Sequence, residues 1–196
     1  GDDPKDKDYL AIAWHTATAS DSLEQHGLRV LAEILFGNNQ APLKKALLDA
    51  QIGGDIDGDF FQAGFPAVFS IDAKYSDTAN MDRFKEVVEI TLTQLVEDGI
   101  SKELIKAALN KITFRLKESV ISESNPRGVL YAISSLNTWL YDLSPFESLE
   151  FSDKLDLLAK LSEEGYFEQL IQDKLLNNTK RVNIKLKADP GKNDAI

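Results

Sequence analysis

The chain has 196 residues, of which 43% are hydrophobic and 28% are charged, and it contains no cysteine. This composition is typical of a globular domain and excludes a disulfide framework and thiolate metal ligands. With 22 Lys and Arg residues and 32 Asp and Glu residues, the formal net charge is −10, which argues against nucleic acids and anionic membranes as partners. No apolar run has the length of a membrane span or the order of a signal peptide.

The first third of the chain predicts a linker, a strand and two helices. Residues 1–8 are charged and lack apolar residues, as in a linker or a tag remnant, whereas residues 9–16 carry apolar side chains on both faces, as in a central strand. Apolar residues spaced by three and four then predict a helix over 22–36. A shorter helix over 42–51 follows and is closed by Gly53-Gly54.

The rest of the chain predicts two paired strands, a series of helices and a final strand. Residues 55–64 and 66–75 are expected to form adjacent antiparallel strands, because the second alternates cleanly between apolar and polar residues. Helices are expected over 81–98, 101–119, 125–141, a short stretch beginning at Ser144-Pro145, 151–161 and 166–175. The helix over 125–141 should bury Leu130, Ile133, Leu136 and Leu140. The strand over 181–188 should bury Val182, Ile184, Leu186 and Ala188.

This order of elements predicts the α+β class. We expect a two-layer sandwich in which helices pack on one face of a mixed or antiparallel sheet of about four strands. The prediction is one domain over 9–191, with a tail over 192–196.

The sequence offers no metal site of a recognised pattern. The histidines are His15 and His26, and neither lies in H-E-x-x-H or H-x-x-E-H. Asp55, Asp57 and Asp59 resemble the start of an EF-hand loop, but its required glycine and its final glutamate are replaced by phenylalanine and proline. We therefore predict no metal ligand in this chain.

Catalytic and phosphate-binding patterns are missing as well. The chain has no nucleophile elbow, and Gly53-Gly54 lacks the remaining residues of a phosphate-binding loop. Glu163-Glu164 stands at a predicted helix N-terminus, where the helix dipole favours acidic residues. Arg127 and Tyr131 are four residues apart on a predicted helix, and that spacing usually gives an ordinary surface contact. No catalytic residue is predicted.

Aromatic residues give the single suggestion of a binding site. Trp14 and Trp139 are expected in the core, because an aromatic residue at strand or helix spacing usually fills volume. Phe60 and Phe61 lie beside glycines and are the residues we predict to face a ligand.

Several segments together resemble the pitrilysin/insulinase (inverzincin) zinc metallopeptidases, and most closely their presequence-protease branch. The segments are Leu31-Ala32-Glu33-Ile34-Leu35-Phe36-Gly37, Ala41-Pro42-Leu43-Lys44-Lys45-Ala46-Leu47, Gly53-Gly54, Glu97-Asp98-Gly99-Ile100, Trp139 followed by Asp142 and Pro145, and 180–191. The resemblance covers about residues 9–191 and depends on the order and spacing of these segments.

This resemblance implies the second, non-catalytic domain of such an enzyme. In the family, four similar α+β domains enclose a chamber, and the first domain carries H-x-x-E-H and the zinc ion. The last domain contributes an arginine and a tyrosine, whereas this chain has Lys74-Tyr75 after the corresponding strand, which argues against that position. The other domains of the same polypeptide are then its partners, and zinc belongs to the parent's first domain.

The function that follows is a chamber-wall domain of a peptide-degrading zinc metalloendopeptidase. Its acidic charge would favour basic, amphipathic peptides, and the isolated chain should be inactive. The parent would act in the bacterial cytoplasm or in an organelle matrix. Two alternatives stay open: a scaffold or core subunit of the same fold that acts only through protein–protein contacts, and an autonomous peptide-binding domain that uses Phe60-Phe61.

Overall fold

The computed structural model describes residues 6–17, 21–61, 67–117, 126–147 and 149–189. The strands in these ranges are β1 (Asp8–Ala17), β2 (Asp55–Phe61), β3 (Ala67–Ser76) and β4 (Arg181–Leu186). The helices are α1 (Ser22–Phe36), α2 (Pro42–Asp49), α3 (Met81–Asp98), α4 (Lys102–Lys117), α5 (Arg127–Trp139), α6 (Ser152–Leu161) and α7 (Tyr166–Ile171). Short 3-10 turns occupy Thr78–Asn80 and Ser162–Glu164, and a π-helical turn over Gln172–Leu176 continues α7.

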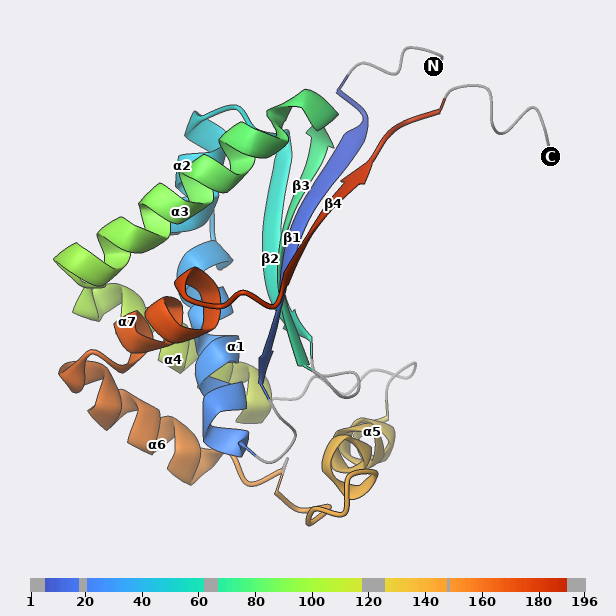
Figure 1. The fold of residues 1–196 in the computed structure, drawn as a ribbon. Helices are drawn as coiled ribbons and strands as arrows, with labels where there is room; N and C mark the ends of the chain where they lie inside the picture. Colours follow the sequence, from blue (N-terminus) through green and yellow to red (C-terminus); the bar gives the residue numbers. More distant parts are fainter. Residues whose placement is uncertain (1–5, 18–20, 62–66, 118–125, 148, 190–196) are drawn as a thin grey trace.

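The strands form one sheet in the order β2-β3-β1-β4, and every pair in it is antiparallel. Helices α1, α2, α3, α4, α6 and α7 lie on one side of this sheet, and none of these helices covers the other side (Figure 1). The predicted α+β class, with helices packed on one face of an antiparallel sheet, is confirmed. The central placement of β1, with a strand on each side, is confirmed as well.

The core lies between the sheet and the helices. Cross-strand partners share a face of the sheet, so the register defines the covered face. On that face the buried pairs are Leu10 with Ala73, Ile12 with Ile71 and Trp14 with Phe69. Helix α1 packs against β2, and its buried residues share one hydrophobic core with these pairs, as the spacing of its apolar residues predicts. Trp14 is therefore a core residue, as expected.

The first helix pair is held by local bonds at its ends. The Asp21 carboxylate accepts a hydrogen bond of 2.9 Å from the Glu24 amide and so caps α1. Pro42 stands in the first turn of α2, where its missing N–H costs nothing. At the end of this pair, the Gly54 amide donates to the Lys74 carbonyl at 3.0 Å, and a Cβ on Gly53 would meet the same oxygen at 2.7 Å. The glycine pair thus allows close approach to β3.

Helix α5 forms as predicted, but the predicted burial of its apolar residues is wrong. Ile133, Leu136 and Leu140 are 55%, 41% and 72% exposed, and Trp139 is 64% exposed rather than in the core. The helix lies apart from the other helices, at the lower end of the sheet's open side (Figure 1). Its apolar face therefore has no covering layer in the described residues. The Leu130 side chain lies outside the described part.

The segment after α5 also differs from its prediction. The helix expected from Ser144-Pro145 is replaced by turns over residues 140–147. Within these turns the Thr138 hydroxyl bonds the Ser144 carbonyl at 2.8 Å, and the Leu143 amide donates to the Thr138 carbonyl at 3.2 Å. These bonds fold the chain back on the end of α5, where a helix would continue away from it.

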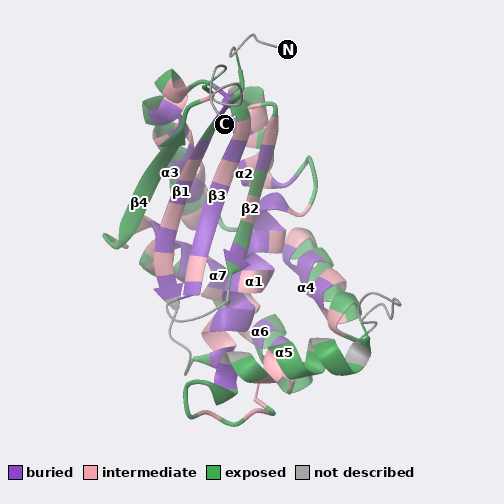
Figure 2. Ribbon diagram, turned by 90° about the vertical axis from the view of Figure 1, so that its right-hand side faces the viewer, coloured by how far each residue is buried: buried purple, intermediate pink, exposed green. Residues whose placement is uncertain are grey.

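Strand β4 is present, but its predicted buried face is wrong. Val182, Ile184 and Leu186 are 52%, 48% and 62% exposed. Their partners in the sheet are Ala13, Ala11 and Tyr9, on the face that the helices leave open. Figure 2 shows β4 exposed along its length at the margin of that face. The alternation of apolar and polar residues in β4 identified its two faces correctly. The register with β1, however, turns the polar face toward the helices, where Arg181 donates to Glu89 of α3 at 2.9 Å.

Among the residues that the structure describes, no helix combines the length and the hydrophobicity needed to cross a membrane.

Candidate functional site

A pocket of about 560 Å³ lies where α1, β2 and α4 meet. The α1 segment contributes Arg29, Ala32, Glu33, Phe36 and Gly37; β2 contributes Asp57, Gly58, Asp59 and Phe60; and α4 contributes Lys111, Ile112, Arg115 and Leu116. The lining is therefore apolar at its base and charged at its rim. Because β2 is the outer strand of the sheet, the pocket lies at the sheet's edge.

Two phenylalanines and one glycine form the base of this pocket. Phe36 and Phe60 are only 5% and 4% exposed. A Cβ on Gly58 would lie 2.3 Å from the Phe36 ring, so any larger residue at that position would collide with it. Gly58 thus allows the Phe36 ring to lie directly against β2, which seals the base of the pocket against the core.

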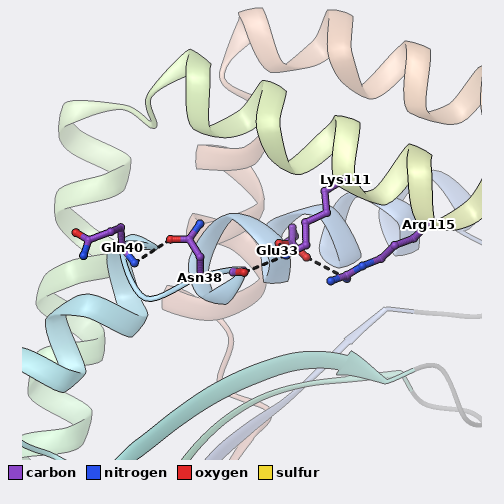
Figure 3. A network of polar contacts seen from close by, with 6 residues as sticks. Glu33, Asn38, Gln40, Lys111 and Arg115 are labelled. Atoms are coloured by element: carbon purple, nitrogen blue, oxygen red, sulfur yellow. Dashed lines mark hydrogen bonds and ion pairs between the residues drawn. The ribbon is translucent and has the colours of Figure 1, made fainter.

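A charged network fixes the rim (Figure 3). The side chain of Glu33 is 9% exposed and pairs with Lys111 and, at 3.1 Å, with Arg115. Lys111 also donates to the Gly37 carbonyl at 3.0 Å, which places a cation at the C-terminal end of α1. The network joins α4 to α1, so it sets the width of the pocket.

The outer edge of β2 has no neighbouring strand in the described residues, and local side chains occupy its donors. The Gly58 amide donates to the Asp57 carboxylate at 2.9 Å, and the Phe60 amide donates to the Asp59 carboxylate at 2.7 Å. In both cases the acceptor belongs to the preceding residue. These carboxylates stand where the carbonyls of an added strand would be, and an extended chain could replace them.

Arg29 adds a partly buried cation to the pocket. Burial lowers the pKa of Arg29 from its ordinary value, and the Asp59 carboxylate opposes that shift. Because an arginine keeps its proton at any physiological pH, the pocket holds cations from α1 and α4 facing carboxylates of β2. A bound chain would meet donors and acceptors on opposite walls.

The titratable side chains that line the pocket are already engaged: Glu33 and Lys111 form an ion pair, and Asp57 and Asp59 accept hydrogen bonds from the amides that follow them. Among the described residues that line it, none is a histidine, serine, threonine or cysteine. The described part of the chain also contains no group of three His, Asp or Glu residues placed to hold a metal ion. The pocket is thus a cavity with a charged rim that lies beside the edge of β2.

The structure separates the residues that the sequence singled out. Phe60 lines the pocket, whereas Phe61 points to the opposite face and is 52% exposed. His15 lies on β1, and His26 is buried in α1 with its Nδ1 2.7 Å from the Ser22 carbonyl. The prediction that Phe60 and Phe61 face a ligand stays a prediction, and the structure does not bring both to one site.

The acidic residues that the sequence analysis considered take part in ion pairs or local hydrogen bonds. Asp55 forms an ion pair of 3.5 Å with Lys74 across the sheet, while Asp57 and Asp59 bond the next amides of β2. Glu163 lies in the 3-10 turn after α6 and pairs with Lys102. Tyr131 is 44% exposed on α5, and the side chain of Arg127 lies outside the described part.

Sequence reasoning missed the charged residues of the pocket. Arg29, Glu33, Lys111 and Arg115 lie on two helices far apart in the chain, and no short motif joins them. One local signal existed: Lys111 and Arg115 are four residues apart on one helical face, as are Arg29 and Glu33. That spacing is too common in helices to identify a site.

The Glu33 network yields a first prediction. Replacing Glu33 by glutamine should lower the free energy of unfolding by about 1–2 kcal/mol, because two charge-assisted bonds become weaker while the side chain stays enclosed. Glu89→Gln is the matched control, since its partner Arg181 is also an arginine but Glu89 is 52% exposed. Its cost should be below about 0.5 kcal/mol. Urea denaturation of both variants measures the difference, and equal losses would contradict the role given to Glu33.

Comparisons with known proteins place this architecture in a family. A family model described as the peptidase M16 inactive domain matches residues 2–112. Protein HypA of Clostridium perfringens is 35% identical over 193 residues, a match that covers 98% of this chain and 20% of that protein. Presequence protease 1, chloroplastic/mitochondrial, of Arabidopsis thaliana is 31% identical over 196 residues and is matched over 18% of its length. The chain thus spans about a fifth of the length of these relatives.

Solved structures agree with the fold. An inactive peptidase domain from Bordetella parapertussis superposes with a TM-score of 0.73 at 17% identity, and the match covers 93% of this chain and 91% of that one. The peptidase M16 inactive domain from Pseudomonas fluorescens gives a TM-score of 0.59 at 14% identity and is matched over 41% of its length. These structural similarities show the fold. The family assignment depends on the family model and on the sequence relatives. The chain belongs to the peptidase M16 inactive domain family, which confirms the resemblance to the presequence-protease branch of the pitrilysin/insulinase metallopeptidases.

Proposed function

We propose that this chain is a non-catalytic wall domain of a zinc metalloendopeptidase and that it holds peptides along the outer edge of β2. Membership of the inactive-domain family and the presequence proteases among its relatives support a role inside a larger peptidase. The matched relatives are about five times as long as this chain, and we assign the catalytic groups to other parts of such a polypeptide.

The observation that carries the binding role is the combination of a pocket with a strand edge that pairs with no other strand in the described part of the chain. An added strand would bond the Gly58 and Phe60 amides, whose present acceptors are side chains of the preceding residues. One of its side chains would then enter the pocket above Phe36 and Phe60. Main-chain bonds of this kind accept many sequences, as a peptide-degrading enzyme requires.

The charge of the domain supports a preference for basic peptides. The formal net charge is −10, and Asp57 and Asp59 stand at the β2 edge itself. When a bound peptide replaces the bonds from Asp57 and Asp59 to the β2 amides, a cationic residue of that peptide would balance the charge of the two carboxylates. Basic, amphipathic peptides such as organelle targeting sequences are the substrate class we propose, in an organelle matrix or the bacterial cytoplasm.

Zinc, which the metallopeptidase family implies, does not fit the described part of this chain. Its histidines lie on different elements, and no group of three potential ligands forms in the described residues. We therefore assign the zinc ion to another domain of the parent.

Peptide titration of the isotope-labelled chain, followed by amide chemical shifts, tests the binding role. A basic ten-residue peptide should shift the Gly58 and Phe60 amides with a dissociation constant of about 0.1–1 mM, the weak range expected for a short flexible ligand. The same peptide with N-methyl groups at every residue cannot donate hydrogen bonds from either edge and is the control. It should bind at least fivefold more weakly, because its main chain cannot pair with β2 in any orientation.

Charge variants make this test specific to the edge. Asp59→Asn should lower the affinity for the basic peptide, whereas Asp153→Asn on the exposed face of α6 should leave that affinity unchanged. Shifts confined to other regions, or equal binding of the methylated and unmethylated peptides, would contradict a β2 site.

A further inference from the structure

A groove of about 350 Å³ lies between the first half of α4 and the end of α6, within the helical layer. The α4 residues that line it share one helical face and are Lys102, Ile105, Lys106, Leu109 and Asn110. The opposite wall consists of Ala159 in the last turn of α6 and of Ser162 and Glu163 in the 3-10 turn after it. This groove is separate from the pocket beside β2, which uses the second half of α4.

Small residues at the end of α6 leave the groove open. On its buried side α6 carries leucines, and Leu155 and Leu158 are 4% and 0% exposed. Ala159 and Ser162, by contrast, place no long side chain against α4. The Ser162 hydroxyl donates to the Ala159 carbonyl at 2.7 Å, so it is held against its own turn. The space between the two helices is therefore not filled by the side chains that border it.

The floor of the groove is apolar, and the helical walls beside it offer no main-chain partner. Ile105 and Leu109 belong to the hydrophobic core, and their outer surface forms the floor. The backbone N–H and C=O groups within a helix bond to each other, so they are not available to a ligand. A peptide lying here would find no partner for its own amides along these walls. The groove therefore suits an apolar body without main-chain polar groups.

The charged residues of the groove differ in whether they already have a partner. Lys102 pairs with Glu163 across the groove, and the bond to that carboxylate raises the pKa of Lys102. The nearby Glu103 carboxylate accepts a hydrogen bond of 2.7 Å from the Ser101 hydroxyl. The side chains of Lys106 and Asn110, one turn apart on α4, bond to no other residue in the described part of the chain. An ammonium and an amide are thus available together to one anionic group.

We propose that this groove binds a small amphiphilic monocarboxylate, with its apolar body on Ile105 and Leu109 and its carboxylate on Lys106 and Asn110. A single carboxylate is expected, because among the described lining residues Lys106 is the cation without an acidic partner. The volume of the groove lies at the small end of the range for ligand sites, which fits an acid of about eight carbons. The site uses none of the residues of the proposed peptide site and is independent of it.

Titration of the isotope-labelled 196-residue chain with octanoate tests this assignment. Saturable shifts are expected at the amides of Lys106, Asn110 and Ala159, with a dissociation constant of about 1 mM, the affinity of a ligand with about ten non-hydrogen atoms. Octanamide has the same apolar chain without the charge and should bind about fivefold more weakly. Shifts that do not saturate, shifts confined to other elements, or equal binding of octanamide would overturn the proposal.

Two variants and one control assign the binding to this groove. Lys106→Gln removes the charge but keeps most of the stem, and it should lower the affinity for octanoate about fivefold. Lys160→Gln is the matched control, since Lys160 is an exposed lysine of α6 that lies outside the lining, and it should leave the affinity unchanged. Ala159→Leu should fill the groove and lower the affinity about tenfold. Because position 159 is exposed, the melting temperature of that variant should stay close to that of the native chain. Unchanged affinity in either of these two variants would overturn the proposal.

A short peptide that ends in leucine tests the other source of such a carboxylate. Acetyl-Ala-Ala-Leu with a free carboxyl terminus places an apolar side chain beside a carboxylate, but its amides have no partner on the helical walls. It should therefore bind about threefold more weakly than octanoate or less. Binding as tight as that of octanoate would assign the groove to peptide carboxyl termini and overturn the proposal. None of these results bears on the amide shifts of Gly58 and Phe60, so the proposed peptide site is tested separately.

Discussion

Replacing Phe36 by alanine is expected to lower the free energy of unfolding by about 4 kcal/mol, as for other large aromatic residues removed from a core. Phe36 is 5% exposed and lies where α1 meets β2, directly beneath Gly58. The change removes buried apolar area and leaves a cavity that backbone on two sides cannot close. Urea denaturation measures the loss. Phe114→Ala on α4 is the control, because Phe114 is 61% exposed and should cost less than about 1 kcal/mol.

A double-mutant cycle with Gly58→Ala identifies the contact responsible. In the native background the new methyl group would meet the Phe36 ring at 2.3 Å, and we expect a loss of about 1–3 kcal/mol. In the Phe36→Ala background the space is vacant, so the same substitution should cost much less. Strictly additive losses would show that the two residues do not form the base of the pocket together.

The stability of the chain is expected to fall on acidification because of His26. Burial lowers the pKa of His26 from 6.5 to about 4, an effect that Arg29 and Lys154 reinforce and the bond to the Ser22 carbonyl opposes. Between these pKa values the unfolded state takes up a proton that the folded state excludes. The contribution of His26 is therefore fully present above about pH 6.5 and lost as the pH falls toward 4. The loss amounts to about 3 kcal/mol at 1.36 kcal/mol per pKa unit.

His26→Gln isolates this contribution, because glutamine cannot titrate but can still donate to the Ser22 carbonyl. Denaturation at several pH values between 4 and 7 should show a steeper pH dependence for the native chain than for the variant. Carboxylates titrate in both proteins, so their effect cancels in the difference. Parallel pH dependences would contradict a buried neutral imidazole.

The sequence predicted the elements that depend on local patterns. The apolar spacing over 22–36 predicted α1, and the alternation over 66–75 predicted β3, because both patterns reflect which side chains the core receives. The glycine pair and Pro42 marked the ends of α2 for equally local reasons. Elements of this kind could be placed without knowledge of their partners.

Predictions failed where burial depends on which face a neighbour covers. The alternation of β4 was read correctly, but only its register with β1 shows that Ile184 faces away from the helices. Likewise, the apolar side of α5 predicts a partner, and the described residues supply none. In a chain that corresponds to a fifth of its relatives, an apolar face does not have to be covered by the chain itself.

Only the β2 side of the pocket could be predicted from the sequence. The Phe60-Phe61 pair drew attention to β2, but alternation in a strand sends two neighbours to opposite faces, so they could not share one site. The Glu33 network depends on contacts between residues 78 and 82 positions apart. Such pairs follow from the packing of α4 on α1 and from no local pattern.

The proposed function depends most on one property: this chain by itself holds no zinc and cleaves no peptide. The most direct test incubates the purified 196-residue chain with zinc and a basic peptide, then measures bound metal and peptide products by mass spectrometry. The account predicts no stoichiometric zinc after dialysis and an intact peptide. Retention of one zinc ion per chain together with hydrolysis of the peptide would contradict it.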